Sequence, residues 1–331
     1  MNILITGLSG YLGQAVVRRL IHKNPFGRVF GIDQRPPKQL GPVRFIHGDL
    51  TSIDVGDLMV LNDIECVLNL VFGNSARSKT AVLATEKVLE AAGLTGVRRV
   101  VQMSGYDVYA TGDRFDQTPR KESDPVWGEQ VAPRHAIRRL QAEKRLWRFA
   151  EIHPRLEAVA LRCCHVIGPH VETRIDAMLR SPWILGRRGR DPLLQFLHVD
   201  DAAEALVRAL QVPDLVGPVN VAGTEAVPLS VMAGILEKPV VNLNPWVARG
   251  GLELLQRTKR INFGPGEWER LVDSAPLDVS MMPLALDYTP RYTTRQTLAL
   301  WRTGYLDPPD PRVAGQTPTQ ELRACVPDES H

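Results

Sequence analysis

A glycine-rich segment near the N-terminus carries the first pattern with a chemical meaning. Residues 6–13 read TGLSGYLG and place three glycines between a short apolar run and a helical pattern. At this spacing the first glycine permits a tight turn, the second lets the backbone approach a pyrophosphate, and the third lets the helix pack closely on a strand. Unpaired N–H groups at the helix start attract phosphate. The segment therefore predicts a dinucleotide site contacted by Gly7, Ser9, Gly10, Tyr11, Leu12 and Gly13.

An acidic residue follows the glycine segment at a spacing typical of a dinucleotide site. Asp33 lies 20 residues after Gly13, at the end of the apolar run Arg28–Asp33. A carboxylate there accepts hydrogen bonds from the adenosine ribose hydroxyls and repels a 2′-phosphate. Arg35 leaves an alternative open, because its guanidinium either accepts a 2′-phosphate or stacks on adenine. We expect NAD as the cofactor, with NADP as the less favoured alternative.

The elements that must position these residues alternate between strands and helices. Apolar runs typical of buried strands cover Asn2–Thr6, Arg28–Asp33, Val43–His47, Glu65–Val71, Arg98–Met103 and Leu156–Cys164. Helical spacing of apolar residues predicts helices over Tyr11–His22, Ala76–Ala92 and Pro133–Glu151. This alternation predicts an α/β fold, a Rossmann-type doubly wound parallel sheet covered on both faces. Residues 111–131 are rich in Pro, Gly, Asp and Glu, which indicates a long loop of the kind that forms lids and site walls.

The chain divides into a dinucleotide-binding part and a smaller mixed part. We expect residues 1–170 to form the dinucleotide-binding domain, with 196–222 returning to its sheet through a strand at Leu193–Val199, a helix at Asp200–Leu210 and a strand at Val219–Val221. Residues 171–195 and 223–306 then form a substrate-binding region. Residues 307–331 are Pro-rich and polar, so we expect an extended or disordered tail.

Composition excludes several classes of protein. The 331 residues are 44% hydrophobic and 23% charged, with 40 Lys and Arg against 37 Asp and Glu, a net charge of +3. This balance is typical of a globular protein and gives no bulk reason to bind nucleic acid. No apolar stretch is long enough to span a membrane, so we expect no membrane partner. The N-terminus does not resemble an export signal, and the four cysteines lack metal-binding spacing. We therefore expect a cytoplasmic protein with reduced thiols and no metal.

Six further segments carry sequence motifs that are recognisable when they are taken together. They are HGDL at 47–50, VVQMSGYDVY at 100–109, LRCCHVIGP at 161–169, FLHVDD at 196–201, PVNVAG at 218–223 and LDYTPRYTTRQTL at 286–298. With the glycine segment and Asp33, they resemble the extended short-chain dehydrogenase/reductase family, the NAD-dependent epimerase/dehydratase group. The resemblance covers most of residues 1–306.

The resemblance implies further cofactor contacts and an assembly. It places Asp49 and Leu50 at the adenine edge and Val71 near the nicotinamide, at the end of the fourth strand. It implies that the C-terminal part caps the dinucleotide domain and makes the pocket for a small-molecule substrate. It also implies a homodimer joined through helices at 76–92 and 133–151.

The chain departs from the family where the family performs its chemistry. The family uses a Tyr-x-x-x-Lys pair on a helix, and this sequence contains none. His135 and Arg139 fall at those two positions, and a spacing of four on a helix would place both on one face. The family's catalytic Ser or Thr falls on Gly105, with Ser104 one residue earlier. Its Arg-Pro-x-Asn becomes the segment 162–165, which ends in His165.

Five residues are therefore candidates for catalysis, and each also has a structural interpretation. His135 is either a proton carrier, since an ordinary histidine titrates near neutral pH, or a surface side chain. Arg139 binds ribose hydroxyls or a substrate acid, or it is a solvated charge. Tyr106 offers a displaced phenol or packs in the core. His165 is a second acid/base or a core histidine, and Ser104 is the nearest hydroxyl to the lost one.

Three function classes remain open from the sequence. The first is an NAD-dependent oxidoreductase or epimerase that acts on a small hydroxyl- or keto-bearing metabolite with rebuilt acid/base groups. The second is a redox-neutral isomerase, cyclase or lyase that keeps the dinucleotide bound. The third is a catalytically silent NAD-binding sensor or scaffold. A cluster of arginines (Arg174, Arg180, Arg187, Arg188 and Arg190) keeps a phosphorylated or carboxylated substrate open.

Overall fold

The central element of the protein is a seven-stranded parallel sheet. A computed structural model describes residues 1–71, 78–110, 115–133 and 136–304. The strand order is β11-β6-β5-β4-β1-β2-β3, and the strands span Ile3–Thr6 (β1), Val29–Asp33 (β2), Val43–His47 (β3), Cys66–Asn69 (β4), Arg99–Gly105 (β5), Glu157–Cys163 (β6) and Gly217–Val221 (β11). Because β1 pairs with both β2 and β4, the strand order reverses at β1, and a crevice opens at the carboxyl ends beside it. The predicted doubly wound α/β fold is confirmed.

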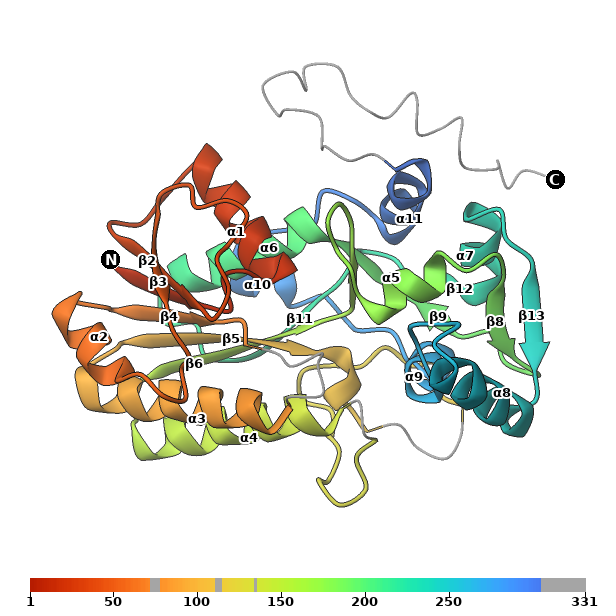
Figure 1. Ribbon diagram of the computed structural model, residues 1–331, viewed down its shortest axis with the longest axis horizontal. Coiled ribbons are helices and arrows are strands. Elements are labelled where there is room, and N and C mark those ends of the chain that lie inside the picture. The colour runs from red at the N-terminus through yellow and green to blue at the C-terminus, as the bar shows by residue number, and fades with distance from the viewer. Residues whose placement is uncertain (72–77, 111–114, 134–135, 305–331) are drawn as a thin grey trace.

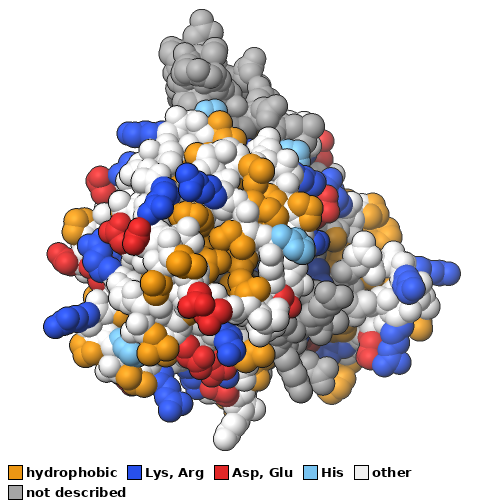
Figure 2. Space-filling view, turned by 60° about the vertical axis from the view of Figure 1, so that its left-hand side comes forward, with side chains coloured by type: hydrophobic (Ala, Val, Ile, Leu, Met, Phe, Trp, Pro, Cys, Tyr) orange, Lys and Arg blue, Asp and Glu red, His pale blue; other side chains and the backbone are white. Residues whose placement is uncertain are grey.

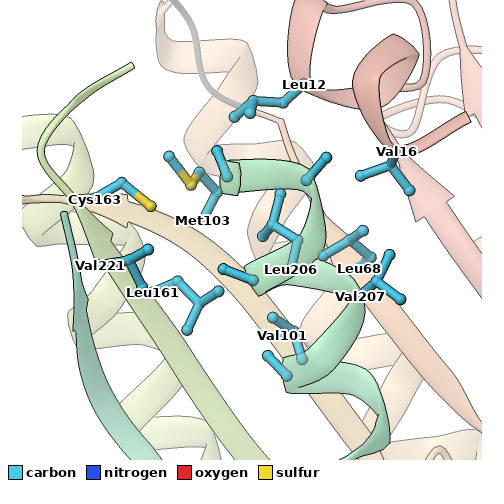
Figure 3. Packing of buried hydrophobic residues seen from close by; sticks show 14 of the residues in the cluster. Leu12, Val16, Leu68, Val101, Met103, Leu161, Cys163, Leu206, Val207 and Val221 are labelled. Carbon is cyan, nitrogen blue, oxygen red and sulfur yellow. The ribbon is translucent and has the colours of Figure 1, made fainter. Parts of the chain in front are cut away.

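Helices cover both faces of the sheet and bury its alternating side chains (Figure 1). One layer contains α1 (Tyr11–His22) and α6 (Val199–Gln211), and the other contains α2 (Val55–Leu61), α3 (Ser78–Thr95) and α4 (Ile137–Ile152). Figure 3 shows Leu206 and Val207 of α6 among Leu68, Val101 and Leu161 of the strands. The alternation of side chains along each strand thus gives two hydrophobic cores, one under each helix layer.

A third core holds the C-terminal region together. It is built from α5 (Arg174–Leu179), α7 (Leu229–Ile235), α8 (Pro245–Arg257), α9 (Pro265–Val272) and α11 (Thr294–Thr303), with α10 (Met282–Leu286) packed nearer the sheet. Short strand pairs join this region: β7 (His165–Ile167) with β10 (Phe196–His198), β8 (Ile184–Arg187) with β13 (Val240–Leu243), and β9 (Leu193–Leu194) with β12 (Val227–Pro228). The region lies beyond the carboxyl ends of the sheet strands, where it closes one side of the crevice (Figure 1).

Two predicted elements differ from the structure. The helix expected over Pro133–Glu151 begins only at Ile137, after a turn in which the Ala136 N–H donates to the Pro133 carbonyl at 2.9 Å. The single strand expected over Leu193–Val199 is broken at Gln195, whose side chain bonds to the backbone of Gly223 and Leu277. The break lets β9 and β10 pair with different strands. The predicted tail, 307–331, lies outside the described residues.

The described residues show the mixed surface charge that the composition predicts. No described helix combines the length and apolar character required to cross a membrane. On the face shown in Figure 2, basic and acidic side chains are interspersed around hydrophobic ones, and neither sign gathers into one large patch. Three of the four cysteines are described; all three are free and buried. No group of described side chains has the composition of a metal site.

Candidate active site

The glycine loop between β1 and α1 has the shape of a phosphate cradle. Gly7 has a φ of +70°, and a Cβ there would lie 2.9 Å from the Leu70 carbonyl oxygen. A Cβ on Gly13 would lie 2.6 Å from the Gly7 carbonyl oxygen. Within the described residues, no side chain caps the start of α1. Its first N–H groups therefore face the crevice without a side-chain acceptor, which is the arrangement that binds phosphate.

Asp33 ties this loop to the end of β2. One carboxylate oxygen accepts the Ser9 N–H at 3.0 Å and the other accepts the Arg35 N–H at 3.1 Å. A carboxylate oxygen accepts more than one hydrogen bond, so Asp33 retains capacity for ribose hydroxyls. Beside it, Asp49 accepts the N–H and hydroxyl of Thr51, which hold the pKa of Asp49 below its usual value. These residues fit a bound dinucleotide.

Tyr106 and His165 form a buried pair beyond the ends of β5 and β6. The Tyr106 Oη lies 3.0 Å from the His165 Nε2 and 3.0 Å from the Arg270 carbonyl oxygen. The hydroxyl has one proton, so it donates to one of these acceptors at a time. Burial raises the pKa of Tyr106, while burial and the Arg270 charge lower the pKa of His165 well below its ordinary value. Both groups are therefore neutral at pH 7.

Asp107 holds two arginines beside this pair. Its carboxylate oxygen Oδ2 lies 2.5 Å from Arg139 Nη1 and 3.3 Å from Arg270 Nε, and its side chain is only 1% exposed. The Arg270 guanidinium also stacks over the Tyr106 ring, 5.2 Å from its centroid. Asp107 and Arg270 are not among the candidate catalytic residues predicted from the sequence. The position of Asp107 in the turn after β5 could have indicated a site residue, whereas no local sequence pattern indicated Arg270.

Gly105 makes room for Arg139. A Cβ at Gly105 would lie 2.9 Å from Asp107 Oδ1 and 3.1 Å from both Cδ and Nε of Arg139. Gly105, which the resemblance predicts to correspond to the family's catalytic hydroxyl, has no side chain, and the Arg139–Asp107 ion pair takes the space. Residues 105 and 139 are therefore sterically linked.

Replacing Gly105 by Ser tests this link. We expect Gly105→Ser to lower the free energy of unfolding by about 1–3 kcal/mol, since the added atoms overpack a filled site. The same substitution in an Arg139→Ala background should cost less, because the two crowding atoms of Arg139 are gone and only Asp107 Oδ1 remains close. A double-mutant cycle measured by urea unfolding reports the coupling. Additive effects of the two changes would contradict the steric link.

The other candidate catalytic residues fall elsewhere. Ser104 donates to Glu143, a buried carboxylate that pairs with Arg162 at 2.8 Å. His135 lies outside the described residues. Helix α4 begins at Ile137, so Arg139 lies on the helix. The described residues do not test the prediction that Arg139 and His135 share one helical face. The structure therefore brings Tyr106, His165 and Arg139 together.

A cavity of about 150 Å³ adjoins this cluster. Tyr106, Asp107 and Arg270 form part of its wall. The rest comes from the segment before α4, from α9 and from the residues that follow α9: Tyr109, Arg120, Trp127, Pro133, Glu269, Asp273, Ser274 and Ala275. The loop is held by backbone bonds from Arg120 to Pro276 and from Asp278 to Arg120, both 2.8 Å. The predicted long loop thus lines the site.

Two arginines of the predicted cluster pair with a residue of the same cavity wall. Arg187 and Arg190 both pair with Asp273, at 2.7 Å and 2.5 Å. Arg174 and Arg180 pair with other carboxylates, those of Glu267 and Asp176. Of the ion pairs that these four arginines make within the described residues, those of Arg187 and Arg190 reach a residue of the cavity wall, Asp273.

The fold and this site define a class of protein: a Rossmann-type dinucleotide-binding protein whose C-terminal region caps a cavity at the carboxyl ends of the sheet. The model of the NAD dependent epimerase/dehydratase family matches residues 3–222. The chain belongs to this family.

Relatives and solved structures agree with this assignment. An uncharacterized protein of Mycobacterium tuberculosis is 24% identical over 317 residues, covering 88% of this chain and 81% of the relative. The structure of MoeE5 in complex with UDP-glucuronic acid and NAD is similar with a TM-score of 0.70 and 25% identity, covering 92% of this chain and 100% of that one. The dTDP-glucose 4,6-dehydratase of Bacillus anthracis, in complex with NAD, shares the fold at 17% identity, with a TM-score of 0.68 and coverage of 92% and 96%.

Proposed function

We propose that the protein is an NAD-dependent enzyme that oxidises, reduces or epimerises a hydroxyl- or keto-bearing metabolite. The observation that carries the proposal is the buried Tyr106–His165 pair, 3.0 Å apart. Tyr106 lines a cavity at the carboxyl ends of the sheet, and His165 lies behind it. Ligands in this type of sheet bind at that edge. A neutral phenol and a neutral imidazole in contact are a proton donor and a proton acceptor, and general acid–base catalysis needs both.

In this proposal, Tyr106 and His165 perform the proton transfer that the Tyr-x-x-x-Lys pair performs in the family. Bound NAD would supply the hydride acceptor and donor. In the reducing direction, Tyr106 gives its proton to the substrate carbonyl oxygen as that oxygen gains negative charge, and a protonated His165 Nε2 returns a proton to the Tyr106 oxygen. In the oxidising direction, the substrate hydroxyl gives its proton to the Tyr106 oxygen, and the Tyr106 proton passes to His165 Nε2. Burial disfavours the imidazolium that oxidation leaves and that reduction requires, so the pair by itself sets no preferred direction.

Arg139 has a different role in this proposal from that of the family's lysine. It holds Asp107 through a 2.5 Å ion pair, and with Arg270 it fixes the turn that carries Tyr106. We assign it to positioning and leave ribose contacts to Asp33 and the loop.

A nucleotide sugar is the substrate class to assay first. MoeE5, the similar structure cited above, was solved with UDP-glucuronic acid and in another form with UDP-glucose, each with NAD. The cavity wall also carries Arg120 and Arg270, whose charges suit a phosphorylated or carboxylated ligand. The test is absorbance at 340 nm with NAD or NADH and a panel of nucleotide sugars, followed by product analysis. Failure of every substrate to react, with the cofactor bound, would favour the silent sensor.

Cofactor preference gives a separate prediction. We expect NAD to bind at least about tenfold more tightly than NADP, because the Asp33 carboxylate would repel a 2′-phosphate. Isothermal titration calorimetry with both cofactors measures the ratio. Asp33→Asn should lower the ratio of NAD affinity to NADP affinity, whereas Arg35→Ala should leave NAD binding unchanged. Tighter binding of NADP to the unaltered protein would show that Arg35 determines the preference.

A redox-neutral reaction is the second candidate. It is favoured by one observation, that the position of the family's catalytic hydroxyl is occupied by the Arg139–Asp107 ion pair. Turnover with no transient or net NADH would identify this class.

A further inference from the structure

Helix α8 is apolar on two opposite faces. Its inner face buries Ala248 and Leu252 in the C-terminal core. Its outer face carries Trp246 and Leu254, two turns apart, with Val247 beside them; these side chains are 81%, 64% and 65% exposed. A helix with apolar side chains all round is normally covered on both sides. The outer strip is thus an exposed apolar surface that calls for a partner.

The strip is unobstructed and stands on the outside of the molecule. Gly250 lies between Trp246 and Leu254 on the same face, and a Cβ built at Gly250 or at Gly251 would meet no atom within 4 Å. Figure 1 shows α8 at the outer edge of the C-terminal region. Neither of the two described cavities is lined by α8. The outer face of α8 is therefore open at Gly250 and Gly251 and lines neither described cavity.

The charge just beyond the C-terminal end of the strip is basic. Along the helix itself the charges are balanced, since Arg249 pairs with Glu269 and Arg257 with Glu253, an exposed carboxylate of α8. Directly after the helix come Lys259 and Arg260, both exposed. An outward apolar strip that contains Trp and ends in basic residues is the pattern of a helix that lies in a membrane interface.

We propose that the outer face of α8 docks on an anionic lipid surface, with Trp246, Val247 and Leu254 entering the headgroup region and Lys259 and Arg260 contacting lipid phosphates. The expectation of no membrane partner rested on the lack of a spanning segment, and an interfacial helix needs none. The proposal is independent of the chemistry in the cavity, which lies on other elements.

The test is co-sedimentation of the full chain with phosphatidylglycerol-rich vesicles and with pure phosphatidylcholine vesicles. We expect binding to the first, weakened by salt, and little to the second. Trp246→Ser with Leu254→Ser should weaken the partition coefficient at least about tenfold. Lys259→Gln with Arg260→Gln should weaken it by about fivefold for each charge removed.

A matched control keeps the result specific. Leu61 on α2 is 79% exposed, so Leu61→Ser removes a comparable apolar side chain far from α8 and should leave vesicle binding unchanged. NAD binding by each variant reports that the chain is folded. Absence of binding to anionic vesicles, or an equal loss in Leu61→Ser, would overturn the proposal. So would concentration-dependent self-association, measured by light scattering, that the α8 serine pair abolishes without any vesicle binding.

Discussion

Tyr106→Phe is expected to lower kcat/KM by at least about 100-fold while NAD binding stays the same, because the substitution removes the proposed proton donor and little else. The ring stays, so its packing against His165, with centroids 4.7 Å apart, is retained. The measurement is steady-state turnover of the first substrate identified, with calorimetry for the cofactor. Loss of turnover together with loss of NAD binding would indicate a structural role instead.

Two variants separate proton transfer from packing. Tyr109→Phe also removes a buried hydroxyl, which donates to Asn220 at 2.7 Å, but that hydroxyl does not contact His165. It should therefore affect stability more than turnover. His165→Gln should reduce turnover and alter its pH profile, since the partner of the phenol is changed. Full activity in Tyr106→Phe would exclude the phenol as the proton carrier and would make the undescribed His135 the next residue to test.

Glu143→Leu is expected to lower the free energy of unfolding by about 3–5 kcal/mol, because it leaves a buried guanidinium without its carboxylate. Arg162 makes hydrogen bonds to both carboxylate oxygens of Glu143, and Ser104 donates to one of them. The pair ties α4 to β6 beneath the candidate site. Urea unfolding followed by circular dichroism gives the change.

The double variant Glu143→Leu/Arg162→Met is the informative control. It removes both charges and should recover most of the loss, since no charge is left buried alone. The exposed pair between Arg302 and Glu237 gives the opposite control, and Glu237→Gln should cost under about 1 kcal/mol. Equal small effects at both sites would show that the buried pair is not a structural anchor.

The parts of the fold with strong local signals could be predicted. Helix α1 and strand β3 have the predicted bounds, because their apolar patterns are uninterrupted and end at breakers or polar residues. The glycine loop was predictable for the same reason, since turn, strand and helix signals coincide within a few residues.

Long-range contacts decide what could not be predicted. The start of α4 is set by a turn at Pro133 rather than by periodicity, and the break at Gln195 depends on backbone partners at Gly223 and Leu277. In the candidate site, Arg270 reaches Asp107 from a helix far along the chain. No local pattern encodes such a contact, so the sequence suggested Arg139 as a ribose or substrate ligand, whereas the structure shows it paired with Asp107.

The close contact between Gly105 and Arg139 imposes an order on substitutions at the two positions. A hydroxyl-bearing residue introduced first at Gly105 would collide with Arg139, whose Cδ and Nε lie 3.1 Å from the new Cβ. A shorter residue introduced first at Arg139 would avoid the collision and leave Asp107 to Arg270 alone. When residue 139 is shortened first, the single variant is not crowded. The effect of a substitution at Gly105 therefore depends on the residue at position 139, and Arg139 is the position to change first.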